Sequence, residues 1–390
     1  MDKIKIIFAN RKDCFDKPGG DTVQMLKTKE YLEKYYPVEI EILLTPEEIL
    51  SDKEAKIVHI FNLQTINETN KFINAARIGN KKVVLSTIYW NLLDTYYIKY
   101  LESLNISPID IPDFFKLILI KVFNLFILSI PNLRKKYERY ISKGLFGTKQ
   151  YVLQRKQALI NSDLLLPNSE EEMILCAKDF HLEKQYIENK SCIIPNATEF
   201  SEESINIENI KDNYQKLKNF ILQVGRIEQI KNQLNLLLSL KDYPEIPIVF
   251  IGRYTDKKYF DKLKKIAEKR GNVFFIEQMP HNNLINFYKQ ASVHVLASFR
   301  ESPGLVSLEA KAAGCPIVVS SKKYCPINYY NFDKYASICN PYDKISIKNA
   351  VFTAIKLNTN NPLPDKYKTY FSYNNVAKLT YNSYLSLLQE

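Results

Sequence analysis

Short apolar runs alternate with amphipathic stretches along nearly the whole chain. The apolar runs predict buried strands, and the stretches between them have the spacing of helices. This alternation is typical of parallel sheets covered by helices. The strands expected in the first half are 3–9, 38–44, 57–63, 81–88, 163–167 and 191–195, and those of the second half are 220–224, 246–252, 272–276, 292–297, 316–320 and 336–339. Two sets of strands predict two Rossmann-like domains.

A polar stretch separates the two sets of strands. Residues 197–218 are rich in Glu, Asn and Lys and lack a long apolar run, as an interdomain connection does. We therefore expect an N-terminal domain over 1–197 and a C-terminal domain over 198–372. The length of 390 residues agrees with two hydrophobic cores. Residues 373–390 have apolar positions at helical spacing and predict a terminal helix, which we expect to pack back on the N-terminal domain.

The most informative segment follows the strand expected at 292–297. Glu301 comes first in a tight loop, Gly304, Leu305 and Val306 open a helix, and Glu309 lies inside that helix. Backbone amides at a helix start point toward an anion, and loops at the carboxyl ends of parallel strands are where open α/β sheets bind ligands. The spacing alone is also compatible with a solvated helix start that carries a capping acid.

Two further segments have the residue types of a phosphate site. A strand ends at Gly225, and two cations, Arg226 and Lys231, follow before an apolar helix. Arg and Lys suit charge-assisted contacts to phosphate, although surface charge would look the same. After the first strand, Gly19 and Gly20 would let the backbone approach a phosphate or a sugar closely, although a plain turn would also use them.

These segments resemble the E-x7-E signature, the G-R-x4-K element and the glycine loop of family 4 (group 1) retaining glycosyltransferases, which have the GT-B fold. The resemblance is strong over 195–321 and extends to the N-terminal half only in outline. It implies two domains that face a central cleft. It also implies that Glu301 contacts the donor sugar and that Arg226 and Lys231 neutralise the diphosphate. The donor-binding residues it implies are Glu309, Gly304, Leu305, Val306, Gly225, Gly19 and Gly20.

The same resemblance implies how the reaction runs. The anomeric configuration is retained by front-face attack, and the leaving phosphate helps to deprotonate the acceptor. We expect no cofactor and no metal, because the sequence has no Asp-x-Asp pair and its four histidines lack ligand spacing. The donor is a nucleotide-diphosphate sugar. On the acceptor side the family often has a histidine that this sequence lacks, and Thr87, Tyr89 or Trp90 is expected to line that region.

Charge and composition add a possible location. The chain has a net charge of +11, and residues 112–149 contain eight basic and two acidic side chains. This stretch includes the apolar run 113–130, which is short for a membrane span and carries two lysines. We expect a helix that lies on an anionic membrane surface, with a buried helix and a true span as alternatives. The concentrated charge argues against nucleic acid as the partner.

The chain begins directly with a strand and has no signal-peptide pattern, which predicts a cytoplasmic protein at the inner face of the membrane. Its six scattered cysteines are expected to be reduced. Transfer to a lipid-linked or glycan acceptor in bacterial surface polysaccharide synthesis follows by analogy. The alternatives are a nucleotide-sugar epimerase or a sugar phosphorylase of the same fold, or a nicotinamide-dependent oxidoreductase, for which the sequence lacks G-x-G-x-x-G.

Overall fold

The computed structural model describes residues 3–136, 138, 141, 145–198, 217–277, 279, 281–302, 304–357 and 363–389. The chain divides into two compact units. The first unit comprises Met1–Tyr100, Ile111–Ala197 and Thr369–Glu390, and the second comprises Leu101–Asp110 and Thr198–Lys368. Two details differ from expectation, because residues 101–110 pack in the second unit and residues 369–372 in the first. Most of the expected connection, 199–216, lies outside the described residues.

The first unit is built on a parallel sheet in the order β2-β1-β3-β4-β5. Its strands are β1 (Ile4–Ala9), β2 (Val38–Leu43), β3 (Ile57–Phe61), β4 (Lys82–Ser86) and β5 (Leu164–Leu165). The helices of this unit are α1 (Gly20–Tyr35), α2 (Pro46–Ser51), α3 (Ile66–Ile78), α4 (Leu93–Ser103, which ends in the second unit), α5 (Asp113–Ser129), α6 (Pro131–Lys136), α8 (Lys149–Asn161), α9 (Glu170–Asp179), α10 (Lys184–Asn189) and α18 (Tyr373–Gln389).

The strands expected at 163–167 and 191–195 are shorter than predicted. Residues 164–165 form β5, and Ser191 makes only a parallel bridge to Leu165. The N–H groups of Cys192 and Ile194 donate to the carbonyls of Leu165 and Pro167 at 2.9 and 3.0 Å. The ladder bond that would lie between these two hydrogen bonds needs an N–H donor at residue 167. Proline has no N–H, so the ladder is interrupted there.

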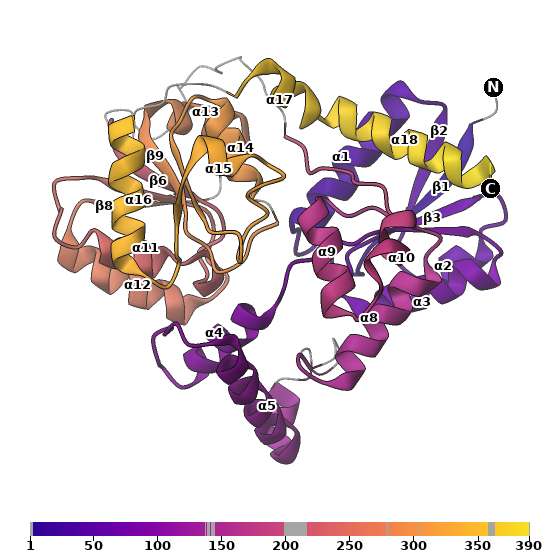
Figure 1. Cartoon of the computed structure of the whole chain (residues 1–390), viewed down its shortest axis with the longest axis horizontal. Helices are drawn as coiled ribbons and strands as arrows, with labels where there is room; N and C mark the ends of the chain where they lie inside the picture. Colours follow the sequence, from indigo (N-terminus) through magenta and orange to yellow (C-terminus); the bar gives the residue numbers. More distant parts are fainter. Residues whose placement is uncertain are drawn as a thin grey trace. The chain divides into compact units, whose positions relative to one another are not determined.

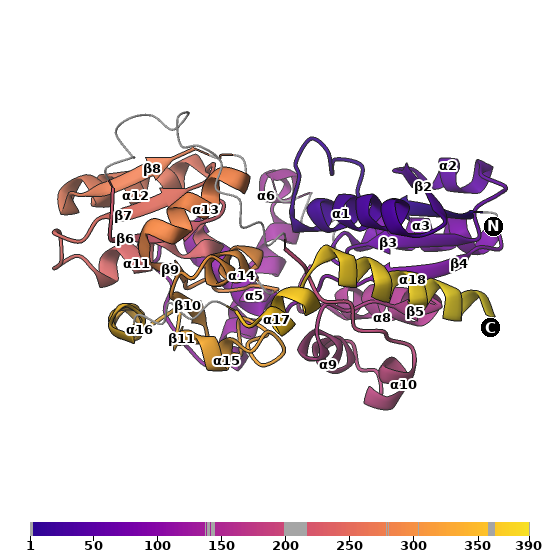
Figure 2. The ribbon, with the colours of Figure 1, turned by 90° about the horizontal axis from the view of Figure 1, so that it is seen from above.

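The terminal helix α18 packs on the first unit, as expected. Figures 1 and 2 both show it running beside α1. Its Val376, Ala377 and Tyr384 join the buried cluster that contains side chains of β1 and β3. The hydroxyl of Tyr384 lies 2.6 Å from Nδ1 of the buried His59, which fixes the register of the helix against the sheet.

The second unit has a six-stranded parallel sheet in the order β11-β10-β9-β6-β7-β8. Its strands are β6 (Phe220–Val224), β7 (Ile248–Ile251), β8 (Val273–Ile276), β9 (Ala291–Leu296), β10 (Ile317–Ser320) and β11 (Ala336–Cys339). Its helices are η2 (Gln229–Lys231), α11 (Gln233–Ser239), α12 (Lys257–Arg270), α13 (His281–Gln290), α14 (Leu305–Ala312), α15 (Phe332–Tyr335), α16 (Lys344–Leu357) and α17 (Asp365–Tyr370, which ends in the first unit).

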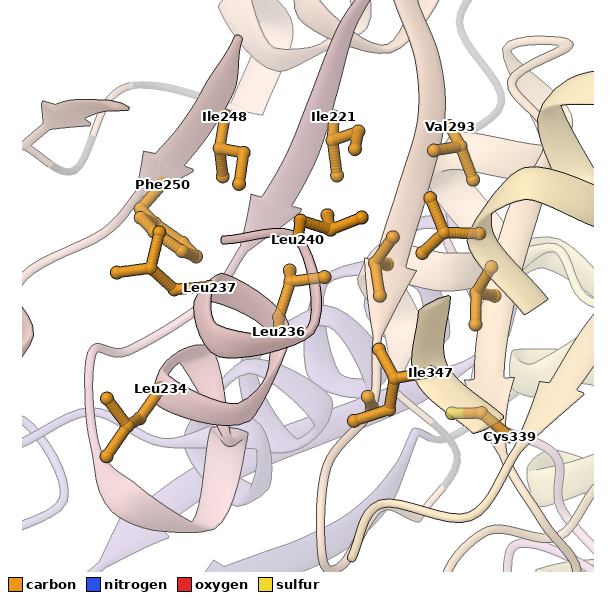
Figure 3. Close-up of a cluster of buried hydrophobic side chains, with 14 of the residues drawn as sticks. Ile221, Leu234, Leu236, Leu237, Leu240, Ile248, Phe250, Val293, Cys339 and Ile347 are labelled. Carbon is orange, nitrogen blue, oxygen red and sulfur yellow. The ribbon is translucent and has the colours of Figure 1, made fainter. Parts of the chain in front are cut away.

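A dense apolar core lies between this sheet and the helices α11, α12 and α16. Figure 3 shows side chains of α11, of α16 and of the strands pointing into it, among them Leu236, Ile347 and Ile221. The strand order reverses between β6 and β9, since β7 and β8 lie on one side and β10 and β11 on the other. Such a reversal leaves the carboxyl ends of the two central strands adjacent and open to a ligand. The predicted motifs follow these two strands.

Candidate active site

The loops after β6 and β9 are joined to each other. The strands pair in register at Leu222 and His294, and beyond them the N–H of Phe299 donates to the carbonyl of Ile230 at 2.9 Å. The loop 225–232 and the loop 297–304 therefore lie side by side at the carboxyl edge of the sheet. This places the two strongest sequence motifs of the second unit at one position.

Lys231 and Glu301 form an ion pair across these loops. The Nζ of Lys231 lies 2.5 Å from Oε1 of Glu301, and their side chains are only 18% and 7% exposed. The backbone N–H of Glu301 also donates to the carbonyl of Tyr324 at 2.7 Å, which fixes the loop. A poorly solvated ion pair interacts more strongly than one in water. The structure thus brings together two residues that are 70 positions apart in the sequence.

Asn232 holds Lys231 in place, and sequence reasoning missed it. It adopts a left-handed conformation (φ +60°) between η2 and α11. Its Nδ2 donates to the carbonyls of Ala297 and Pro341, both at 2.8 Å. The Nε2 of Gln223 donates to the carbonyl of Lys231 at 2.6 Å. Asparagine tolerates this conformation better than most residues, and its position directly before a helix was the available signal.

Gly304 must be glycine at the start of α14. It has φ +84°, and a Cβ there would lie 2.6 Å from a side-chain carbon of Leu296 and 3.3 Å from Oε2 of Glu301. The next residues, Leu305 and Val306, are half-buried and begin the helix. Their N–H groups belong to the first turn, where an α-helix supplies no acceptor. The helix start therefore lies directly beside the Glu301 carboxylate.

Gly225 ends the β6 region with φ +142°, in a conformation that few other residues adopt. Its carbonyl oxygen would lie 2.2 Å from a Cβ placed on Gly252 of the neighbouring loop. A side chain at position 252 would collide with the Gly225 backbone, whereas position 225 favours glycine because of its positive φ and not for lack of space. This pair of glycines shapes the loop that carries Arg226.

Arg226 does not join the Lys231–Glu301 pair. Its Nη2 lies 2.9 Å from Oε1 of Glu228, and its side chain is 49% exposed. An exposed pair of this kind contributes little to stability and leaves the guanidinium free to exchange partners. Of the three residues predicted to be catalytic, Lys231 and Glu301 lie together, whereas Arg226 pairs with Glu228.

Glu309 is held by groups that the sequence did not reveal. The hydroxyl of Tyr288, from α13, donates to Oε2 of Glu309 at 3.0 Å. The Oγ1 of Thr198 lies 3.5 Å from the other carboxylate oxygen. Burial raises the pKa of Tyr288 well above its usual value, and the negative charge of Glu309 raises it further. Tyr288 therefore remains a donor at any ordinary pH.

His294 lies on β9 below the loops and is fully buried. Burial lowers its pKa to about 3, with a smaller contribution from the positive charge of Lys231. The backbone N–H of Val224 donates to Nε2 at 3.4 Å, so the neutral ring carries its proton on Nδ1. The edge of the imidazole meets Tyr288 with ring centroids 5.7 Å apart. The histidine is thus a neutral, buried neighbour of Tyr288.

The glycine loop of the first unit has a different explanation from the one expected. Gly19 is the N-cap of α1 in extended conformation (φ −128°). A Cβ on it would lie 2.6 Å from a carboxylate oxygen of Asp21, which pairs with Nε of Arg11 at 3.0 Å. Glycine here makes room for this ion pair. A Cβ on Gly20 would meet nothing within 4 Å. A donor role for either glycine stays a prediction.

The residues expected to line the acceptor side, Thr87, Tyr89 and Trp90, are buried in this structure, and an acceptor role for any of them stays a prediction. The hydroxyl of Thr87 donates to Oε1 of Glu172, and the backbone N–H of Tyr89 donates to the same oxygen at 2.9 Å. The hydroxyl of Tyr89 donates to Asp179 at 2.7 Å. Both side chains are fully buried, because α9 supplies the acids that satisfy them. Trp90 is only 3% exposed.

Comparison with known proteins gives a family match for the second unit. Residues 205–372 match the family model described as glycosyl transferases group 1. The D-inositol 3-phosphate glycosyltransferase of Corynebacterium urealyticum is 33% identical over 108 residues, which are 25% of this chain and 26% of that protein. The chain thus spans about a quarter of the length of the curated relatives that it matches.

Solved structures extend the likeness to the whole chain. Anabaena Alr3699/HepE, in complex with UDP and glucose, superposes with a TM-score of 0.68 at 14% identity and covers 98% of this chain and all of that one. Sucrose-phosphate synthase from Thermosynechococcus elongatus gives a TM-score of 0.69 at 13% identity, with 99% and 100% covered. The chain therefore has the two-domain GT-B fold that was expected, and its second unit carries the sequence pattern of group 1 glycosyltransferases.

Proposed function

We propose that the protein is a retaining glycosyltransferase that moves a hexose from a nucleotide-diphosphate sugar to an acceptor. The observation that carries the proposal is the poorly solvated Lys231–Glu301 pair beside the start of α14, at the point where the strand order reverses. The match of 205–372 to group 1 glycosyltransferases includes every residue of this arrangement. The UDP bound to the Anabaena neighbour makes a UDP-sugar the first donor to test.

The residues have separate parts in this proposal. Cleavage of the bond between the sugar and the diphosphate builds negative charge on the phosphates, and Lys231 and Arg226 neutralise it. The N–H groups of Gly304, Leu305 and Val306 face the same charge at the helix start. Glu301 binds hydroxyls of the donor sugar, and Glu309 binds the ribose. The acceptor attacks from the face that the phosphate leaves, so the configuration is retained. No metal is required, because Lys231 and Arg226 neutralise the charge on the phosphates.

The pair seen in the structure has a consequence for donor binding. Lys231 is already close to its working position, because Glu301 compensates its charge. A diphosphate that approaches the helix start takes over part of this compensation, and the Glu301 carboxylate then accepts from sugar hydroxyls. Such preorganisation lowers the free energy that must be spent on orienting the cation.

We further propose that the acceptor is a lipid-linked or glycan molecule of bacterial surface polysaccharide synthesis, used at the inner face of the cytoplasmic membrane. The support for this location is the apolar and basic segment around α5. No helix among the described residues is long and apolar enough to cross a membrane.

Donor binding tests the main proposal directly. Thermal unfolding is measured with UDP, GDP, ADP and CMP sugars at one common concentration, and a donor present at about 100 times its Kd should raise the free energy of unfolding by about 2.7 kcal/mol. The stabilising donor is then incubated with the protein and candidate acceptors, and the anomeric configuration of the product is determined by NMR. Chelator should leave the rate unchanged.

Three results would contradict the proposal. An inverted product excludes retention, and a rate that falls with chelator excludes the metal-free mechanism. Isomerised nucleotide sugar without transfer would instead indicate an epimerase of the same fold.

A further inference from the structure

The helix α5 exposes a largely apolar side, and two polar residues lie on its buried side. Its buried residues are Lys116, Ile120, Asn124 and Ile127, which recur at helical spacing and form one stripe. The opposite side is exposed and apolar, and two of its side chains, Phe114 and Leu125, are 68% and 64% exposed. The other large apolar side chains exposed on α5 are Phe115, Ile118, Val122, Phe126 and Leu128. An ordinary surface helix has the reverse arrangement.

Polar contacts fix this orientation. The Nζ of Lys116 lies 2.8 Å from Oδ1 of Asp94 on α4, with side chains 0% and 8% exposed, and 5.5 Å from the ring centre of Tyr97. One helical turn further along the stripe from Ile120, Nδ2 of Asn124 donates to the carbonyl of Phe146 at 3.0 Å. Rotating α5 to hide its phenylalanines would separate a buried ion pair and leave an uncompensated charge, which is strongly unfavourable. The apolar side is therefore held outward.

Basic residues accompany the exposed apolar side. Lys121 is exposed within it, and Arg134 and Lys135 are exposed on α6, which packs against α5. Arg139 and Lys143, which were also expected here, lie outside the described residues, and so does the side chain of Lys136. Long cationic side chains can lay their methylene groups along an apolar surface while the charge stays in water. This combination matches the boundary between acyl chains and anionic headgroups.

We infer that the exposed side of α5 inserts into the surface of an anionic bilayer, with Phe114, Leu125 and Phe126 in the acyl region and Lys121, Arg134 and Lys135 at the headgroups. The charges select this partner over a second copy of the chain, because a symmetric contact would bring like charges together. The inference deepens the proposed function, since it names the surface that reaches a lipid-linked acceptor. It requires nothing of the donor site.

Sedimentation with vesicles tests the inference. Wild-type protein is mixed with phosphatidylcholine vesicles, or with vesicles that also contain phosphatidylglycerol, at low and high salt. We expect binding to the anionic vesicles at low salt and little binding to the neutral ones. The variant F114S/L125S/F126S should lose on the order of 10³-fold in partition coefficient, since burial of each phenylalanine or leucine contributes about tenfold or more.

Matched variants separate the surface from general charge. K121E/R134E/K135E should bind on the order of 10²-fold less, at about fivefold for each cation. The control K262E/K265E/K269E makes the same charge change on the exposed, polar side of α12, whose apolar side is buried in the core, and should bind nearly as wild type. Far-UV circular dichroism and donor-induced thermal shifts on the same samples report folding and the donor site, so loss of vesicle binding alone is attributable to α5.

The inference is overturned if wild-type protein stays in the supernatant with anionic vesicles, or if both α5 variants bind like wild type. It is also overturned if light scattering shows a dimer that F114S/L125S/F126S converts to a monomer without vesicles present, since a second copy then covers the surface. Binding to vesicles without binding to any nucleotide sugar would support the inference and contradict the proposed function.

Discussion

The carboxyl edges of the two sheets carry similar residue types in different states. At the edge of the second sheet, Lys231 and Glu301 pair with each other beside a helix start. At the edge of the first, Glu172 is fully buried and accepts from Thr87 and from the backbone of Tyr89. The first carboxylate can exchange a cation for a ligand, whereas the second completes the packing of its own loop. Position at a sheet edge marks a ligand site only where polar groups are left to exchange.

The largest effect should come from removing the charge of each carboxylate in turn. E301Q should lower kcat/KM for sugar transfer on the order of 10²-fold or more, because a transition-state contact is lost. E172Q should instead lower the free energy of unfolding by about 1–3 kcal/mol, because hydrogen bonds to a buried charge are weakened. The measurements are initial rates and urea unfolding for both variants.

The two variants should differ in the property that they lose, which is activity for E301Q and stability for E172Q. E301Q should lose activity at temperatures where it is still fully folded, and the KM of E172Q for the nucleotide sugar should be unchanged. If E301Q transfers sugar at the wild-type rate, the site assignment in the second unit is incorrect. If E172Q loses donor binding while its stability is intact, the first edge has a ligand role that its burial hides.

Acid should weaken both units by the same mechanism. His59 and His294 are buried, one in each sheet, and burial lowers the pKa of each to about 3. The unfolded chain takes up protons below pH 6.5 while the folded chain does not, so stability is complete above that pH and is lost as the pH falls toward 3. Each histidine contributes a slope of about 1.4 kcal/mol per pH unit.

Urea unfolding at several pH values between 3.5 and 7 measures this slope. Replacing either histidine by asparagine should reduce it by about 1.4 kcal/mol per pH unit. A slope that is identical in wild type and in both variants would mean that carboxylates, and not the two histidines, set the acid sensitivity.

The smallest effect concerns Tyr288, which orients Glu309. Y288F removes the hydroxyl that donates to Oε2 and should raise the KM for the nucleotide sugar about fivefold with kcat nearly unchanged, as the loss of about 1 kcal/mol of ground-state binding does. Because Glu309 is proposed to bind the ribose, the preference for a ribonucleotide over its 2′-deoxy analogue should fall by a similar factor. A lower kcat at constant KM would point to the transition state instead.

The sequence predicted the strands and the loops of the second unit well, because apolar runs and the glutamate motif are local signals. It could not predict that Asn232 would bond to carbonyls 65 and 109 positions away, or that Tyr288 would reach Glu309 from another helix. It did not reveal that Thr87 and Tyr89 are buried, because their partners, Glu172 and Asp179, follow much later in the chain. Such contacts depend on topology, and no periodicity records them.

Which side of α5 is exposed was also not predicted, although the sequence contained a signal for it. Thirteen of the residues in 113–130 are apolar, so apolar spacing alone selects no face. Two of the polar residues in this run, Lys116 and Asn124, are eight positions apart and therefore lie on one side of a helix. In the sequence they interrupt an apolar run, whereas in the structure they bind α5 to Asp94 and to the carbonyl of Phe146.

The path of the chain between the units limits how this protein can be divided. The boundaries fall after Tyr100, Asp110, Ala197 and Lys368, so neither unit is encoded by one uninterrupted stretch. Residues 101–110 complete the second unit, where Asp110 accepts from Asn340 and Asn105 from Lys258. A clone of 198–368 would lack this decapeptide, and a clone of 1–197 would lack α18. Exchanging donor specificity by swapping the second unit between homologues would therefore have to carry two gene fragments together, 101–110 and 198–368.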